Sequence, residues 1–130
     1  MKNIELFNLY VAKIFDYLYD DFPIAKDIDI CEFIGVEVDP FELQLPKECK
    51  IFEHTMYFLK EEGFIDYKRG DTNGFFQVRL TLKGLSILKK KPKALKASFI
   101  ESIKHWIGVG NEELIKKTID LIFEGISSVS

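Results

Sequence analysis

The chain has 130 residues, of which 47% are hydrophobic and 14% aromatic, and it carries a formal net charge of −3. This length and composition predict one globular domain with a hydrophobic core and exclude a disordered chain, which would be poor in aromatic residues. No apolar run reaches the roughly 20 residues of a membrane-spanning helix, and polar residues near the N-terminus argue against a signal peptide. We therefore expect a soluble, cytoplasmic protein without a membrane partner.

The charges are distributed unevenly along the chain. Residues 1–66 contain 6 Lys and 15 acidic residues, a net charge of −9, whereas residues 67–130 have a net charge of +6. Within residues 67–104 there are 10 basic residues and 2 acidic ones. Such a basic patch could attract nucleic acid. It could equally face the acidic half, within the monomer or across a dimer.

The residue pattern in the N-terminal third of the chain predicts a helix, then a short strand and then a second, short helix. Apolar residues at positions 4, 7, 11, 14, 15 and 18 have helical spacing over residues 3–20, and Pro23 ends that helix. Residues 27–35 begin with the alternation of a strand and finish as a short helix closed by Gly35. Residues 36–46 contain two prolines and predict a loop, whose Phe41, Leu43 and Leu45 we expect to pack down onto the core.

Residues 47–62 give the strongest helical pattern in the chain. Pro46 precedes the helix, as is common at a helix start. One side of this helix is predicted to be an apolar stripe of Ile51, Phe52, Thr55, Phe58 and Leu59. The opposite side carries Lys50, Glu53, His54, Tyr57 and Glu61.

A β-hairpin is predicted directly after this helix. Gly63 is placed to end the helix and turn the chain. Residues 64–67 and 75–80 are aromatic and β-branched runs typical of paired strands. Residues 69–74 contain the turn-forming pairs Gly70-Asp71 and Asn73-Gly74, and they are predicted to connect the strands.

Three further helices follow the hairpin. Thr81 is predicted to cap a helix that runs to about Leu88. Residues 94–107 and 112–126 are amphipathic, and Asn111 is predicted to cap the second of them. The expected organisation is a domain over residues 1–91 and a C-terminal helical hairpin over residues 92–130. This hairpin would pack on the first part, form a dimer interface, or both.

Two segments resemble a known architecture. Tyr57-Phe58-Leu59-Lys60-Glu61-Glu62-Gly63-Phe64-Ile65 and Arg79-Leu80-Thr81-Leu82-Lys83-Gly84 are similar to segments of small bacterial winged helix-turn-helix regulators of the MarR and PadR families. In those families, such segments end the recognition helix and close the wing. The resemblance covers about two thirds of the chain. It implies an α+β, mainly α fold: a winged helix-turn-helix with a two-stranded wing, here followed by two additional amphipathic helices.

The resemblance also implies a function, that of a DNA-binding transcriptional regulator that dimerises through its C-terminal helices. The helix over residues 47–62 would then enter the major groove of double-stranded DNA. The residues expected to contact DNA are Lys47, Lys50, His54, Tyr57, Lys68, Arg69 and Arg79. The helix contains no Arg, Asn or Gln for base readout and carries several Glu, so an ordinary solvated face is an alternative for Lys50, His54 and Tyr57.

No catalytic motif is present, so we expect neither an enzyme nor a cofactor or metal site. His54 and His105 stand alone, and Cys31 and Cys49 lack a paired spacing, which favours reduced thiols over a disulfide. A non-catalytic protein-interaction module is an alternative function, for example an adaptor or an antagonist of a nucleic-acid-binding partner. A third is a sensor whose small-molecule pocket is lined by Tyr10, Phe15, Tyr19 and Trp106.

Overall fold

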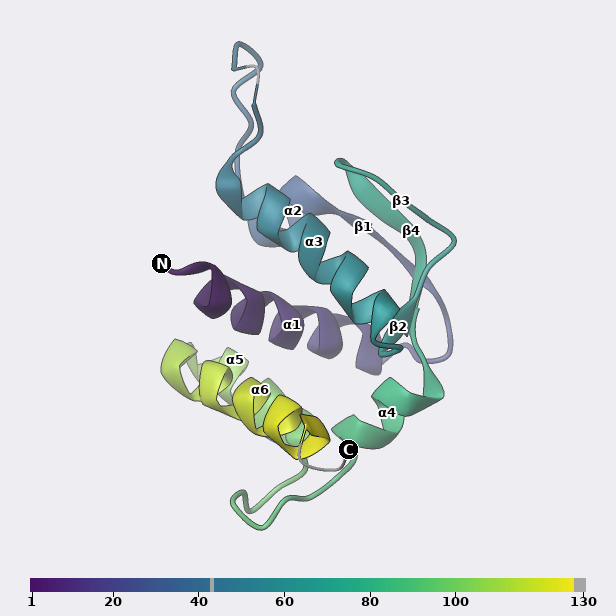
Figure 1. Ribbon diagram of the computed structural model, residues 1–130, viewed down its shortest axis with the longest axis vertical. Helices are drawn as coiled ribbons and strands as arrows, with labels where there is room; N and C mark the ends of the chain where they lie inside the picture. The colour runs from purple at the N-terminus through teal and green to yellow at the C-terminus, as the bar shows by residue number, and fades with distance from the viewer. Residues whose placement is uncertain (43, 128–130) are drawn as a thin grey trace.

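Helix α1 (Asn3–Tyr19) is the element around which the others are arranged (Figure 1). The computed structural model describes residues 1–42 and 44–127. Over these residues the fold is α+β and mainly helical, with six helices and a four-stranded antiparallel sheet. The α1 helix buries residues around most of its circumference: Leu6, Asn8, Leu9, Tyr10, Val11, Ala12, Ile14, Phe15 and Leu18. It is therefore a central core helix and not a surface helix with a single apolar face.

The sheet is built around its longest strand, β4 (Gly74–Leu80). On one side β4 pairs with β1 (Lys26–Asp29), and on the other with β2 (Ile65–Asp66), giving the order β1-β4-β2; β3 (Arg69–Gly70) also pairs with β4. All of these pairings are antiparallel. The predicted two-stranded hairpin is thus widened by β1, which comes from a distant part of the sequence.

The turn of the hairpin is shorter than the sequence predicted. Arg69 and Gly70 were expected in the turn but form β3, opposite Phe76 and Phe75. The physical reason is the carboxylate of Asp71, which accepts hydrogen bonds from the amides of Asn73 and Gly74 and closes the turn within residues 71–73.

Strand β4 contains a bulge that changes which residues face the core. Gln77 has a φ of 59°, and its amide donates to the carboxylate of Asp27 at 3.0 Å. The register with β1 shifts at the same place. Phe75 and Val78 are consequently both buried although they are three residues apart, which a regular strand would not allow.

A long connection joins α2 (Ile30–Ile34) to α3 (Lys47–Glu61). Gly35 ends α2 with a φ of 71°, as predicted. The connection then projects away from the body of the protein (Figure 1). The expectation that its apolar residues pack down is wrong for Phe41, which is 92% exposed, and for Leu45, which is 39% exposed. Asp39 organises the tip locally by accepting from the amide of Phe41, and Leu43 lies outside the described residues.

The buried side of α3 differs in part from the predicted stripe. Phe52, Thr55 and Leu59 are buried as predicted, together with Cys49 and Met56. Phe58 is 41% exposed, so its assignment to the buried stripe is wrong. Residues 52, 55, 56 and 59 follow the helical spacing of one face, and Phe58 lies at the margin of that face, edge-on to Phe7 of α1.

The three C-terminal helices are α4 (Leu82–Leu88), α5 (Phe99–Val109) and α6 (Glu112–Ser127). The predicted caps are confirmed: Thr81 accepts from the amide of Gly84, and Asn111 accepts from the amide of Leu114. Helix α5 was expected to begin at Ala94 but begins at Phe99. Its actual N-cap is Ser98, whose hydroxyl accepts from the amide of Glu101.

Helices α5 and α6 pack against α1 on the side opposite α3 (Figure 1). Lys104 of α5 lies 2.6 Å from Asp16 and 2.8 Å from Asp20, and Lys116 of α6 lies 3.9 Å from Glu5. These two lysines of the basic half thus form ion pairs with carboxylates of the acidic half. Residues 128–130 of the expected C-terminal hairpin lie outside the described residues. Among residues 1–42 and 44–127, no helix has the length and hydropathy needed to span a membrane.

Candidate nucleic-acid interface

One row of side chains runs along the exposed side of α3. Lys47, Lys50 and His54 are exposed and are spaced by three and four residues, so they lie above one another along the helix. The structure therefore brings together three of the four residues that the sequence proposed on this helix. The face they form is narrow and carries positive charge towards the N-terminal end of α3.

Tyr57, the fourth residue, is engaged within the protein. Its hydroxyl donates to the carboxylate of Glu53, and this hydrogen bond, with burial, raises the pKa of Tyr57 to about 12. The ring lies edge-on to the rings of His54 and of Phe75 in β4, at centroid distances of 5.4 and 5.7 Å. Tyr57 thus connects the exposed side of α3 to strand β4 of the sheet.

Lys68 and Arg69 are exposed at the start of the hairpin, beside this junction. The guanidinium of Arg69 lies 4.6 Å from the ring centre of Phe76, which is 37% exposed. On the other face, the ring of Phe75 passes so close to Gly70 that a Cβ there would lie 2.2 Å from it. Because the ring of Phe75 also contacts Tyr57, this ring connects Gly70 of β3 to α3. The exposed pair of Arg69 and Phe76 was not recognised in the sequence, where Phe76 was taken only as a strand residue.

Arg79 lies apart from the other candidates. It is paired in register with Asp66, whereas Arg69 is paired with Phe76. The two positions on β4, Phe76 and Arg79, are three residues apart, about 10 Å along a strand. Arg79 instead lines a shallow pocket with Phe22, Pro23 and Leu82. The structure does not join it to the group formed by α3 and β3.

The candidate cations differ in ion pairing from a few lysines elsewhere in the described residues, such as Lys60 and Lys104. Within residues 1–42 and 44–127, none of Lys47, Lys50, Lys68, Arg69 and Arg79 forms an ion pair. By contrast, Lys60 near the end of α3 binds the carbonyl of Tyr67 at 3.0 Å and lies 3.5 Å from Asp66. The cations beside the hairpin therefore remain available to an anionic ligand.

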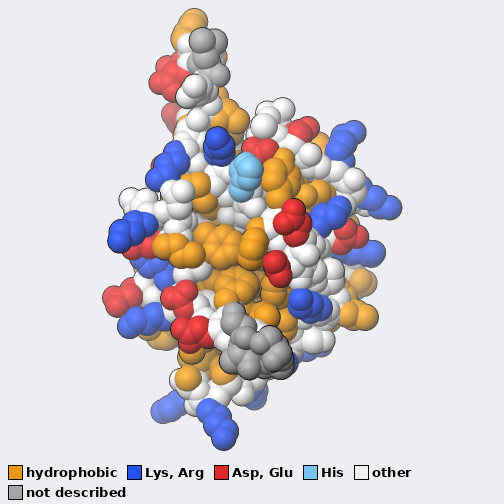
Figure 2. Space-filling view, in the orientation of Figure 1, with side chains coloured by type: hydrophobic (Ala, Val, Ile, Leu, Met, Phe, Trp, Pro, Cys, Tyr) orange, Lys and Arg blue, Asp and Glu red, His pale blue; other side chains and the backbone are white. Residues whose placement is uncertain are grey.

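A second surface feature is an apolar groove between α1, α3 and α6, which we call the aromatic groove. Its floor contains the rings of Phe7, Phe58, Phe64 and Phe123, with centroid distances of 5.4 Å for Phe7–Phe58, 5.7 Å for Phe7–Phe123 and 5.8 Å for Phe64–Phe123. Glu62 and Asp120 line it as well. Figure 2 shows hydrophobic side chains gathered in the middle of this face, with acidic side chains at their border. This groove was not predictable from the sequence, because its residues come from four separate segments.

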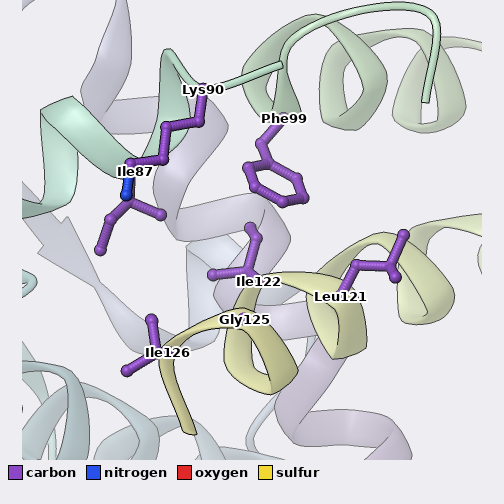
Figure 3. Close-up of a pocket in the computed structure, with 7 residues that line it drawn as sticks. All are labelled: Ile87, Lys90, Phe99, Leu121, Ile122, Gly125 and Ile126. Carbon is purple, nitrogen blue, oxygen red and sulfur yellow. The ribbon is translucent and has the colours of Figure 1, made fainter. Parts of the chain in front are cut away.

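A smaller apolar pocket lies where α4, α6 and the start of α5 meet. Ile87, Phe99, Ile122 and Ile126 surround it, and Lys90 stands at its edge (Figure 3). A single lysine gives it little capacity to orient a polar ligand. The aromatic pocket of the sensor hypothesis does not correspond to it, since Tyr10 and Phe15 are core residues that pack on Phe52 and Phe64.

The part of the chain that the structure describes contains no group of three or more His, Cys, Asp or Glu placed to hold a metal ion. Comparisons with family models, curated proteins and solved structures find no match to this chain.

Proposed function

We propose that this protein is a winged-helix DNA-binding protein that acts in transcriptional regulation. The order helix, strand, helix, helix and hairpin from α1 to β4, with the sheet order β1-β4-β2, supports the winged-helix assignment. In this arrangement α3 would enter the major groove and the Lys68–Gly70 segment would act as the wing along the phosphates.

The observation that carries the proposal is the group of exposed cations without carboxylate partners. Lys47 and Lys50 lie on α3, and Lys68 and Arg69 lie on the hairpin that Tyr57 holds beside it. Each cation that contacts a phosphate releases counterions, which makes the affinity fall with salt. Because α3 has no Arg, Asn or Gln, phosphate contacts would dominate and sequence preference would be modest.

The first experiment is a fluorescence anisotropy titration of the protein with random-sequence duplex DNA at low and at physiological salt. We expect binding that weakens steeply with salt. The Lys68→Ala/Arg69→Ala variant should bind roughly tenfold more weakly at low salt, and its log–log salt slope should be about 2 smaller in magnitude.

The matched control is Lys13→Ala/Lys96→Ala, which removes the same charge from exposed positions elsewhere. It should leave both the affinity and the slope near those of the unmodified protein. Equal losses in the two double variants would assign the binding to net charge alone, and no binding at low salt would refute the proposal.

A second candidate, a protein-interaction module, is favoured by the aromatic groove. Its phenylalanine floor and the carboxylates of Glu62 and Asp120 suit an amphipathic helix with apolar and basic residues. Basic segments of this kind are common in nucleic-acid-binding proteins, which fits an adaptor or antagonist of such a partner. This candidate does not require DNA binding.

A labelled amphipathic Lys/Leu peptide can probe the groove directly. Replacing the exposed ring of Phe58 by serine should weaken peptide binding roughly tenfold or more, since burying a phenylalanine contributes about 1.5–3 kcal/mol. Phe41→Ser is the matched control, because Phe41 is even more exposed but lies on the projecting connection. Equal affinities for the Phe58→Ser and Phe41→Ser variants would exclude the groove as the peptide site.

A further inference from the structure

Two cysteines that are 18 residues apart in the sequence meet in the fold. Cys31 lies in the first turn of α2 and Cys49 in the first turn of α3, and their sulfur atoms are 3.7 Å apart. Both are free thiols. Their spacing of 18 residues in the sequence did not indicate that the two thiols are neighbours.

The two thiols differ in access to solvent. Cys49 is 1% exposed, whereas Cys31 is only partly buried. Burial, together with the hydrogen bond to Cys31, raises the pKa of the Cys49 thiol to about 11. Cys49 is therefore protonated at neutral pH, and an oxidant from solution would meet Cys31 first.

The surroundings of Cys31 allow the remaining approach of the sulfurs. A disulfide has an S–S distance of about 2.05 Å, so the two atoms need to close by less than 2 Å. Helix α2 has only 5 residues, of which Ile30 alone is fully buried. The two helices are already in contact, with the ring of Phe33 in α2 lying 5.4 Å from the ring of Phe52 in α3. A small shift of α2 can therefore bring the sulfurs together while α3 stays in place.

We propose that Cys31 and Cys49 form a reversible dithiol–disulfide pair that is oxidised by peroxide and that links α2 covalently to α3. The Cys31 sulfur attacks one peroxide oxygen; the S–O bond forms, the O–O bond breaks, and the second oxygen leaves as water after taking up a proton. The Cys49 sulfur then attacks the Cys31 sulfur; the S–S bond forms, the S–O bond breaks, and a second water leaves with the Cys49 proton.

The balance of this reaction is two thiols and one hydrogen peroxide giving one disulfide and two waters. The sulfur pair loses two electrons, which reduce the peroxide. The disulfide would close the α2–α3 segment and restrict the unfolded chain, so the oxidised protein should be the more stable form. This modification site is independent of what the exposed side of α3 binds.

The test treats the full-length protein with a small molar excess of hydrogen peroxide and then blocks any remaining thiols with an alkylating reagent. Intact mass should show a loss of about 2 Da and no alkylation, and peptide mapping without reductant should recover a Cys31–Cys49 cross-linked peptide. The thermal midpoint should rise by about 5–15 °C and return on adding dithiothreitol.

The Cys49→Ser and Cys31→Ser variants supply the controls. Cys49→Ser should stop at an oxygenated Cys31, seen as a gain of mass, without a rise in the thermal midpoint. Three results would overturn the proposal: disulfides only between two molecules, oxygenated Cys31 in the unmodified protein without cross-linking, or two thiols that remain fully alkylatable. The measurements on the unmodified protein stay decisive even where a variant fails to fold.

Discussion

A single backbone oxygen explains why a glycine stands in the segment that follows β4. Gly84 is buried in α4, and a Cβ added there would lie 2.3 Å from the carbonyl oxygen of Phe64. The hydroxyl of Thr81 joins the same junction, because it donates to the carbonyl of Gly63 at 2.6 Å and accepts from the amide of Gly84. The Thr-x-x-Gly spacing therefore serves to dock α4 onto the chain between α3 and β2.

This close approach predicts opposite effects for two glycine-to-alanine changes. Gly84→Ala should destabilise the protein by about 1–3 kcal/mol, because the methyl group meets backbone that cannot move aside easily. Gly108→Ala is the control: it lies in α5 with no atom within 4 Å of the added Cβ, and should stabilise by about 0.5–1 kcal/mol through helix propensity. Urea denaturation followed by circular dichroism measures both. A Gly84→Ala protein as stable as the unmodified one would contradict the account.

At the scale of elements, the sequence predicted the helices, chain reversals and caps that depend on residues close together in the chain. The helices α1, α3 and α6, the Gly35 and Gly63 chain reversals and the caps at Thr81 and Asn111 all follow from spacing and cap chemistry. The start of α5 was placed early because Ala94 and Leu95 fit a helical stripe, while the cap at Ser98 overrides that pattern.

Features that depend on contacts distant in sequence were not predictable in the same way. The pairing of β1 with β4 and the bulge at Gln77 join residues 50 positions apart through the Asp27 carboxylate. Likewise, no local signal in the sequence indicates that the ring of Tyr57 packs on Phe75. The exposed cations of the candidate site were predictable from their charge alone. Their grouping in space and the separation of Arg79 from the others were not predictable.

At the scale of the whole molecule, the C-terminal helices belong to the same core as the rest of the chain. Ile103 of α5 and Ile119 and Ile122 of α6 are at most 1% exposed, and both helices pack on α1. Helix α1 is therefore shared between the sheet with α3 on one side and the α5–α6 pair on the other. Dimerisation through these helices stays a prediction, and it would have to use the surface that remains outside this packing.

Removing residues 92–130 should therefore do more than delete helices α5 and α6: it should also destabilise the part of the protein that remains. The exposed side of α1 would present large apolar area to water, so we expect aggregation and loss of a cooperative thermal transition. Size-exclusion chromatography and thermal denaturation measure the outcome. A soluble truncated protein with an unchanged transition would show that the C-terminal helices are dispensable.

A milder comparison within α5 keeps the chain complete. Ile103→Ala removes a fully buried side chain and should cost about 2–5 kcal/mol, whereas Val109→Ala changes a side chain that is 61% exposed and should cost less than about 0.5 kcal/mol. Similar stabilities for the two variants would place α5 outside the shared core.

The projecting connection between α2 and α3 is a place where the chain can be cut by a protease. Phe41 at its tip is an accessible substrate for a protease that cuts after aromatic residues. Such a cut would separate α1, β1 and α2 from everything that follows, yet β1 pairs with β4 and α1 packs on α3 across the break. The two fragments would stay associated as a nicked protein, which makes this connection the natural place to split the chain into complementing halves or to insert a reporter domain.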